Sequence, residues 1–404
     1  MLMVRIEYLG KIVFRGKKPE LKAILDSLAE ILRQNIVRKP VIVNENNVVK
    51  QTNENIKLYW ALRILGVSYI PISTVDTEIR IPLEDLGLFD NIELNPYKVF
   101  NNTLELLYRN WPTPLVKLNS LSSNDIRVWA KLEGFNPYSG SIKDRIGWYM
   151  FIKSVEEGVA KDKKILYEAT STNTGMALAA MAAIHGFKAK LYLPASIQKV
   201  SDTLLRVLGA EVIRKPKTLT VEFVDEVDND AKRDNALHLN QFENDYNFEV
   251  HLKYTAKEIE IQCRKAGFYP KAIIGGIGTS GHMSAIAFYF KNRFKGYTKI
   301  YCIQPAQGHV IPGIRRIETG MKWIHLVEVD DIIDVERDEA IGEAINIARH
   351  EGILVGLSSG AVVAGFRKLV DKGIIGEGDY VLVFPDHGFK YFEQFEEYFN
   401  KHGY

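Results

Sequence analysis

The chain has 404 residues, with 52 lysines and arginines against 50 aspartates and glutamates, so its formal net charge is +2. This balance gives no electrostatic reason to expect binding to nucleic acid or to an anionic membrane. Hydrophobic residues make up 46% of the chain, enough to fill the cores of two or three domains. The only cysteines are Cys263 and Cys302, far apart in sequence, so we expect neither a disulfide framework nor a metal site.

The first ten residues have neither a long apolar core nor a cleavage site, and no apolar run approaches the roughly 18 residues of a membrane span. We therefore expect a cytoplasmic protein without a signal peptide.

Residues 1–100 carry strand and helix signals of their own. An apolar strand at 40–44 precedes an amphipathic run at 56–65 and a second apolar strand at 66–72. This order resembles a short part of a ParB-type module. The basic and histidine-containing signature expected in the active loop of that module is replaced by Gln-Thr-Asn-Glu-Asn at 51–55. We therefore expect this domain to have a structural role, in dimer contacts or in covering a cleft.

From about residue 110 onward, strand patterns alternate with helix patterns. One example is the apolar strand at 189–193, which is followed by a helical pattern at 200–208. Such alternation predicts an α/β fold, with parallel sheets covered by helices on both faces.

A lysine stands in the run Ser-Gly-Ser-Ile-Lys-Asp-Arg at 139–145. The preceding segment, 135–140, is turn-forming, and 146–155 has helical apolar spacing, which places Lys143 at a loop-to-helix junction. A lysine amine forms imines once burial or a neighbouring cation lowers its pKa. Taken alone, this lysine is more simply a solvated surface charge, so its interpretation depends on three further motifs.

The second motif is Ile-Ile-Gly-Gly-Ile-Gly-Thr-Ser-Gly-His at 273–282, an apolar strand that runs into a glycine-rich turn and then a helix. Such a turn presents backbone N–H groups at a helix N-terminus and can bind an anion, although glycine can also serve tight packing alone. The glycine spacing also fits dinucleotide binding, which requires an acidic residue at the end of the next strand. That strand, 299–303, is followed by Gln304 and Pro305, so we predict a site for a single phosphate.

The third motif, Glu-Ala-Thr-Ser-Thr-Asn-Thr-Gly at 168–175, lies between a strand at 164–167 and an alanine-rich helix at 176–184. Its small polar residues offer more donors than one helix cap needs, which favours a carboxylate site. The fourth, Gly-Leu-Ser-Ser-Gly-Ala at 356–361, is again a small polar turn between a strand and a helix. Alone it is more simply a capping motif.

Together these residues resemble the fold type II pyridoxal-phosphate enzymes, the tryptophan synthase β-like group, and within it the cysteine synthase family. The resemblance runs from Thr-Pro-Leu-Val-Lys-Leu at 113–118, through Lys-Leu-Glu-Gly-Phe-Asn-Pro at 131–137, to Pro385-Asp386. It implies a catalytic domain over 101–404 with two parallel-sheet subdomains, the smaller at about 144–245, and pyridoxal 5′-phosphate bound between them. It also implies a homodimer.

The resemblance assigns roles to the motifs. Lys143 matches the lysine that forms the imine with the cofactor, Asn173 the amide that bonds the 3′ oxygen, and Ser358 the partner of the pyridine nitrogen. The matching phosphate loop consists of Gly278, Thr279, Ser280, Gly281 and His282. The matching substrate-binding residues are Thr170, Ser171, Thr172, Thr174 and Gln241. Three positions depart from the family pattern: Thr172 and Ser280 each replace a glycine, and His282 replaces a threonine that bonds the phosphate.

The residue types also bear on the reaction. A hydroxyl opposite the ring nitrogen need not keep that nitrogen protonated, which disfavours transamination and suits loss of a leaving group from Cβ followed by addition of a nucleophile. We expect Lys143 to carry out the proton transfers.

Arg315 and Arg316 end a loop where cysteine synthases that use O-acetylserine have small uncharged residues. Because guanidinium groups bind phosphate in a bidentate manner, we predict that O-phosphoserine and sulfide give cysteine and phosphate. The alternative is that both arginines form surface ion pairs with Glu318 or similar residues. O-acetylserine sulfhydrylation, cystathionine formation from serine, and dehydration remain as alternative reactions. A catalytically silent amino-acid-binding protein is the alternative of another class.

Overall fold

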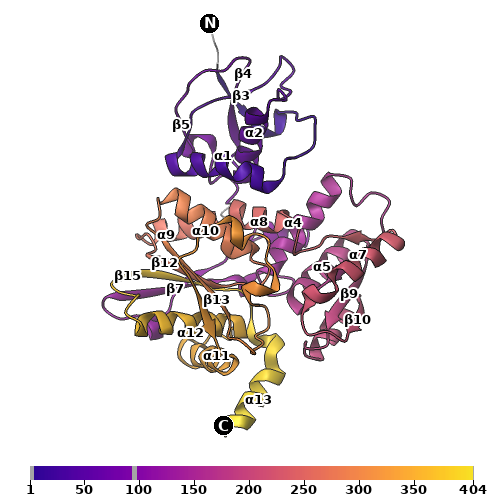
Figure 1. Cartoon of the computed structure of the whole chain (residues 1–404), viewed down its shortest axis with the longest axis vertical. Helices are drawn as coiled ribbons and strands as arrows, with labels where there is room; N and C mark the ends of the chain where they lie inside the picture. Colours follow the sequence, from indigo (N-terminus) through magenta and orange to yellow (C-terminus); the bar gives the residue numbers. More distant parts are fainter. Residues whose placement is uncertain (1–3, 93–97, 404) are drawn as a thin grey trace.

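The computed structural model describes residues 4–92 and 98–403. Figure 1 shows three parts: an amino-terminal domain in indigo, a large sheet below it, and a smaller sheet beside the large one. Within the described residues, no helix is long and apolar enough to cross a membrane.

The amino-terminal domain has a three-stranded sheet in the order β1-β4-β3 and a separate two-stranded pair, β2-β5. Its elements are β1 (Arg5–Tyr8), α1 (Leu21–Gln34), β2 (Ile36–Val37), β3 (Val41–Ile42), α2 (Asn53–Leu65), β4 (Tyr69–Ser73) and β5 (Ile81–Pro82). Both helices end at a residue in the left-handed conformation, Asn35 with φ 54° and Gly66 with φ 73°.

The predicted strand at 40–44 is shorter in the structure, where β3 spans only Val41–Ile42. Beyond Ile42 the pairing continues only as an isolated antiparallel bridge between Val43 and Val49. The buried side chain of Asn55 binds the end of β3, since its Oδ1 accepts from the Ile42 N–H at 2.7 Å and its Nδ2 donates to the Ile42 carbonyl at 2.8 Å.

The large sheet has the order β14-β13-β12-β15-β7-β6, and only its edge strand β6 is antiparallel to its neighbour. Its strands are β6 (Leu115–Lys117), β7 (Ile126–Leu132), β12 (Ala272–Gly276), β13 (Lys299–Pro305), β14 (Asp331–Val335) and β15 (Gly378–Phe384). Helices α9 (Ala256–Lys265) and α10 (Gly281–Arg293) lie on one side, and α11 (Arg337–Glu351) and α12 (Leu357–Asp371) on the other (Figure 1). Every residue of β12 and β15 is buried, as expected for parallel strands covered on both faces.

The smaller sheet, β10-β9-β8-β11, is parallel throughout and lies within the predicted subdomain at 144–245. Its strands are β8 (Ile165–Ala169), β9 (Lys188–Pro194), β10 (Glu211–Lys215) and β11 (Leu237–His238). The helices of this region are α4 (Lys143–Glu156), α5 (Thr172–His185), α6 (Val200–Val207) and α7 (Val224–Arg233). Three further helices are α3 (Glu105–Tyr108), α8 (Tyr246–Val250) and α13 (Phe392–His402).

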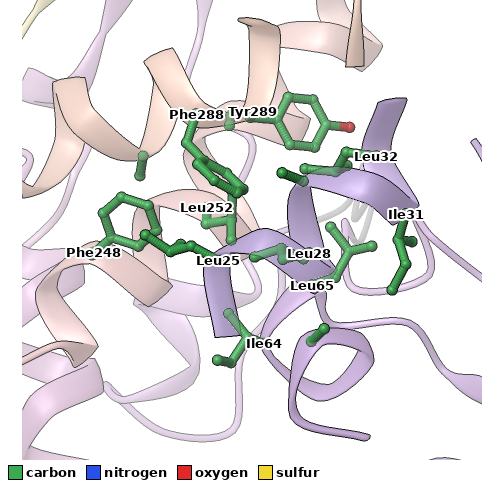
Figure 2. Close-up of a cluster of buried hydrophobic side chains, with 14 of the residues drawn as sticks. Leu25, Leu28, Ile31, Leu32, Ile64, Leu65, Phe248, Leu252, Phe288 and Tyr289 are labelled. Atoms are coloured by element: carbon green, nitrogen blue, oxygen red, sulfur yellow. The ribbon is translucent and has the colours of Figure 1, made fainter. Parts of the chain in front are cut away.

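A π-helical segment, η6 (His251–Thr255), joins α8 to α9 and lies against the amino-terminal domain. Figure 2 shows the contact, in which leucines of α1 and α2 pack against aromatic and leucine side chains of α8, η6 and α10. The labelled side chains are Leu25, Leu28, Ile31, Leu32, Ile64, Leu65, Phe248, Leu252, Phe288 and Tyr289. The two domains therefore share one hydrophobic core.

Polar contacts accompany this core. The fully buried Lys257 of α9 donates to the Leu88 carbonyl at 2.8 Å and to Asn91 Oδ1 at 2.9 Å. Burial lowers the pKa of Lys257 well below its ordinary value, because these partners are neutral oxygens. On the other flank, the Arg293 guanidinium pairs with Glu84 of the amino-terminal domain and with Glu260 of α9.

Candidate active site

A cavity of about 110 Å³ lies where loops after the carboxyl ends of the strands of both sheets meet. This is the edge where ligands bind in parallel α/β sheets. Eight of the predicted site residues line it: Lys143, Ser171, Asn173, Thr174, Gln241, Gly278, Thr279 and Arg315. Seven do not: Thr170, Thr172, Ser280, Gly281, His282, Ser358 and Arg316. The lining residues all lie beyond residue 140, so no described residue of the amino-terminal domain lines the cavity.

Lys143 is the first residue of α4, three residues earlier than the predicted start of the helix. The carboxylate of Asp144 accepts from the backbone N–H of Tyr138 at 2.7 Å and of Ser139 at 2.9 Å. These bonds fold the preceding loop back onto the first turn of the helix and satisfy part of its polar backbone.

Arg145 fixes the same turn from the other side. Its buried guanidinium donates to carboxylates of Glu133, after β7, and of Glu258, on α9. Lys131 adds a 2.8 Å bond to Glu258. Because all four charges are fully buried and paired, loss of one partner would leave an uncompensated charge. The network therefore holds Lys143 at a defined position.

The Lys143 amine is poised to act as a nucleophile. Burial lowers its pKa to about 8, an effect that Asp386 opposes and the Arg315 guanidinium reinforces. A substantial fraction of the amine is therefore neutral near pH 8, as imine formation requires.

The predicted carboxylate loop forms the start of α5, which begins at Thr172. Thr174 Oγ1 donates to Gln241 Oε1 at 2.8 Å, and Gln241 Nε2 donates to the Ala169 carbonyl at 3.0 Å. Ser171 and Asn173 also face the cavity. The helix N-terminus presents backbone N–H groups there, so the arrangement can bind a carboxylate.

Two threonines of this loop point elsewhere. The Thr172 hydroxyl lies 2.6 Å from that of Ser201 on α6, and the Thr170 hydroxyl donates to the Ser171 carbonyl at 2.8 Å. Both side chains are buried. Neither residue lines the cavity, and each hydroxyl has a partner within the loop or on α6. Their binding to substrate stays a prediction. Thr172, which replaces the glycine of the family pattern, instead ties the loop to α6.

The predicted phosphate loop leads from β12 into α10, whose first residue is Gly281. Ser280 precedes the helix with φ 72°, a left-handed conformation that favours glycine and explains why the family pattern has one there. Gly278 has no room for a side chain, since an added Cβ would lie 2.5 Å from the Gly313 carbonyl oxygen. The loop therefore has the tight shape that exposes its N–H groups.

Several buried polar atoms near the loop lack partners among the described residues. They are Nδ1 and Nε2 of His282, Oγ of Ser280 and Oδ1 of Asn173. Burial, followed by the positive charge of Lys143, lowers the pKa of His282 to about 3, so its imidazole is neutral and can donate one N–H. Asn173 Oδ1 can only accept, whereas the Ser280 hydroxyl and the one N–H of His282 can donate, and such unpaired donors at a helix N-terminus suit a buried phosphate. These donors thus suit the phosphate of pyridoxal 5′-phosphate, and the Lys143 amine is available to form an imine with the carbonyl group of that cofactor.

Two residues without a predicted role contact these loops. Asn247 of α8 donates to the Gln241 carbonyl at 2.8 Å and to Thr279 Oγ1 at 2.9 Å. Asp386, two residues after the end of β15, accepts from Asn173 Nδ2 at 2.8 Å. Asp386 ends the resemblance noted above, and its place after an apolar strand could have indicated a site residue. No local sequence signal distinguishes Asn247.

Arg315 and Arg316 lie in different surroundings. Arg315 lines the cavity, where its Nε donates to the Gly278 carbonyl at 2.7 Å and its guanidinium lies 5.1 Å from the centroid of the Phe242 ring. Its other hydrogen-bond acceptors among the described residues are oxygens of Thr319, so no carboxylate neutralises it there. Burial lowers its pKa to about 10, and it remains a cation at neutral pH.

Arg316 points away from the cavity, which corrects the expectation that both arginines face a phosphate. Its guanidinium pairs with Glu318 and Asp334 at 2.9 Å each and also donates to the Pro305 carbonyl. The alternative of a surface ion pair with Glu318 therefore describes Arg316, because consecutive residues of this extended segment project to different sides.

Comparison with known proteins agrees with this site. The family model described as "Pyridoxal-phosphate dependent enzyme" matches residues 106–386, and the chain belongs to that family. Within it, the chain belongs to the cysteine synthases. It is 34% identical to cysteine synthase B of Escherichia coli over 72% of this chain and 94% of that one. It is 33% identical to a cysteine synthase of Aquifex aeolicus over 73% and 92%.

The solved structures give the same result. A hydrogen sulfide-producing enzyme from Fusobacterium nucleatum matches with a TM-score of 0.65 and 29% identity, over 72% of this chain and all of that one. The predicted tryptophan synthase β-like fold, the cofactor and the enzyme class are thereby confirmed. The protein is a pyridoxal-phosphate dependent enzyme that catalyses β-replacement on serine substrates. When bound, the cofactor withdraws electrons from the substrate Cα.

Proposed function

We propose that the protein makes L-cysteine and phosphate from O-phosphoserine and sulfide. The observation that carries this proposal is Arg315, a partly buried guanidinium that lines the same cavity as Lys143 and lacks a carboxylate partner among the described residues. An unneutralised cation beside a nucleophilic lysine favours a substrate that carries a dianionic phosphate group over one that carries an uncharged acetyl ester.

In this proposal, different residues bind the cofactor, move the α-proton, bind the substrate carboxylate and bind the leaving phosphate. Lys143 holds the cofactor and moves the α-proton, which its lowered pKa supports. Ser171, Thr174 and the N–H groups at the start of α5 hold the substrate carboxylate. Arg315 binds the leaving phosphate. Asn173, Ser358 and the 278–282 loop hold the cofactor.

Phe242 supports the assignment of Arg315. Its ring lies beneath the guanidinium, and the Gly278 carbonyl holds the Nε end of the side chain, so the remaining N–H groups keep a defined direction. A guanidinium that is already fixed loses little conformational entropy when it binds a phosphate. A mobile surface arginine would lose more.

The alternatives differ in what the cavity must hold. In O-acetylserine sulfhydrylation the bound ester offers Arg315 no charged group, since the acetyl group gains its negative charge only as it leaves as acetate. Cystathionine formation must admit a second amino acid, homocysteine, beside the cofactor. A catalytically silent binding protein has no need of a lysine amine that lines the cavity, as Lys143 does. We therefore place all three below the O-phosphoserine reaction.

We further propose that residues 1–100 have a structural role, through the core that they share with α8, η6 and α10. A homodimer remains a prediction.

Product analysis tests the reaction. With O-phosphoserine and sulfide, the purified holoenzyme is expected to release cysteine and inorganic phosphate in equal amounts. Release of pyruvate and ammonia in place of cysteine would indicate elimination of phosphate without addition of sulfide and would contradict the proposal. Absence of any product with either serine ester would favour the silent binding protein.

A further inference from the structure

Arg214, on β10, binds the backbone of a loop that lines the cavity. Its Nη1 donates to the carbonyls of Pro194 at 2.9 Å and Ile197 at 2.7 Å, and its Nη2 donates to the Gln198 carbonyl at 3.1 Å. Pro194 and Ile197 both line the cavity. A guanidinium is a rigid planar fork with several N–H donors, so this one side chain can fix the course of the whole 194–198 loop.

The guanidinium is itself oriented by Asp202 on α6. Arg214 Nε donates to Asp202 Oδ1 at 3.0 Å, and Arg214 Nη2 lies 2.8 Å from the same oxygen. Both side chains are partly exposed, so this ion pair contributes little stability of its own. Its effect is to direct the guanidinium toward the three carbonyls.

A second loop that lines the cavity is bound to the first, since Ser196 Oγ donates to the Thr218 carbonyl at 2.7 Å. We call these two loops, 194–198 and 217–221, the small-subdomain wall. Arg315 lines the same cavity from a loop of the large-sheet subdomain.

The wall is linked to the turn that precedes Lys143. The buried Gln198 side chain donates from Nε2 to the Lys390 carbonyl at 2.8 Å. The buried ammonium of Lys390 in turn donates to the Ser139 carbonyl at 2.7 Å. One end of the wall is therefore fixed relative to the nucleophilic lysine.

The wall is also linked to the start of α5, where the proposed function places the substrate carboxylate. Ser201 is the residue before Asp202 on α6, and its hydroxyl lies 2.6 Å from the Thr172 hydroxyl. Both hydroxyl-bearing side chains are buried. Consecutive residues of α6 thus bind Thr172 and Arg214, so the wall and the carboxylate loop hold a fixed shape relative to each other.

We propose that Arg214 is a positioning residue for the amino-acid substrate, because it holds the small-subdomain wall in place beside a substrate bound at the start of α5. The inference rests on the proposed function for the place of the substrate carboxylate and is independent of the leaving group. A wall that is already fixed loses little conformational entropy when substrate binds, whereas a loosened wall must be ordered at that step. Arg214 does not line the cavity, so the chemical step keeps its rate.

The test compares substrate and cofactor binding in Arg214→Ala holoenzyme, with whichever serine ester the wild-type enzyme converts faster. We expect KM for that ester to rise about tenfold while kcat stays within about twofold. L-serine, which carries the amine and carboxylate of the substrate, should bind correspondingly more weakly, as followed by the imine absorbance without sulfide. The dissociation constant of pyridoxal 5′-phosphate should stay at the wild-type value.

Arg206→Ala is the matched control, because it removes an exposed guanidinium from the same helix that carries Asp202, and it should leave all these constants unchanged. Asp202→Asn should raise KM less than Arg214→Ala does, and the two effects should not add in the double variant. If Arg214→Ala does not fold, Arg214→Lys replaces it, since a lysine keeps the charge beside Asp202 but lacks the planar fork. Its KM is expected to rise as well.

A wild-type KM in the folded Arg214 variant would overturn the proposal. Equal weakening of cofactor and substrate binding would also overturn it, because Arg214 would then only support the fold of the smaller subdomain.

The failure of the proposed function is recognised separately. If the wild-type holoenzyme converts neither serine ester and L-serine leaves its imine absorbance unchanged, the substrate site is wrong and this inference fails with it. If the wild-type enzyme prefers O-acetylserine, the proposed leaving group is wrong, and the KM comparison still decides the role of Arg214.

Discussion

The amide of Asn247 donates to Thr279 Oγ1 at 2.9 Å and so connects helix α8 with the loop that precedes α10. The same side chain limits what can stand at Gly281, where an added Cβ would lie 2.1 Å from Asn247 Oδ1. The next residue of α8, Phe248, packs against the amino-terminal domain (Figure 2). One short helix therefore supports the proposed phosphate loop and packs against the described part of the amino-terminal domain.

Asn247→Ala is expected to weaken cofactor binding about tenfold, because the loss of a buried hydrogen bond costs on the order of 1–2 kcal/mol. The dissociation constant is measured by titrating apoenzyme with pyridoxal 5′-phosphate. Asn292→Ala, at the other end of α10, removes a side-chain bond to the Phe288 carbonyl and should leave the constant unchanged. Equal weakening of cofactor binding in both variants would show that binding depends on α10 as a whole and not on the loop before it.

Leu28→Ala is expected to lower the free energy of unfolding of the whole chain by about 2–5 kcal/mol, since the side chain is fully buried between the two domains. Thermal unfolding followed by circular dichroism should show one transition at a lower temperature. The control is Val207→Ala at a side chain that is 80% exposed, for which we expect a change below about 0.5 kcal/mol. An early, separate transition in Leu28→Ala would mean that the amino-terminal domain unfolds independently.

The lowered pKa of Lys143 predicts how the rate of imine formation with the cofactor depends on pH. The pKa is lowered to about 8, so the protonated amine predominates below that pH and the neutral, reactive amine above it. The rate at which apoenzyme forms the imine absorbance should therefore rise about tenfold per pH unit up to pH 8 and then level off. A rate that keeps rising to pH 10 would show that the amine is not perturbed.

Lys143→Ala is expected to give no imine absorbance at any pH, while the protein remains folded. Lys188→Ala, at an exposed lysine, should behave as the wild type does. Normal absorbance in Lys143→Ala would assign imine formation to another lysine.

Variants of Arg315 and Arg316 provide a matched test of substrate preference. Arg315→Ala should lower kcat/KM for O-phosphoserine by about 10- to 100-fold relative to O-acetylserine, as expected for loss of a charge-assisted bond of 1.5–3 kcal/mol. Arg316→Ala should change neither value by more than about twofold, because exposed ion pairs contribute little. Equal losses on both substrates in Arg315→Ala would contradict a phosphate role.

The sequence predicts those features that depend on local pattern. Strand-turn-helix units with glycine or small polar residues in the turn, such as 273–282, predicted where the loops of the site lie. Helix starts were displaced by a few residues, as at Lys143, because the bonds of Asp144 and Arg145 that begin α4 come from side chains the pattern does not weigh.

Contacts between distant segments were not predictable in this way. The bonds of Asp386 to Asn173 and Ser358 span 213 and 28 positions. The opposite directions of Arg315 and Arg316 depend on which side of one segment faces the cavity. Both are set by the packing of the two sheets, which composition and periodicity do not specify.

The measurement that tests the account most directly is the rate of cysteine formation by the wild-type holoenzyme at subsaturating O-phosphoserine or O-acetylserine with the same sulfide concentration. The account predicts that kcat/KM for O-phosphoserine exceeds that for O-acetylserine at least tenfold, and that the ratio falls as ionic strength rises. A higher kcat/KM for O-acetylserine would leave the fold and Lys143 in place but contradict the phosphate role of Arg315.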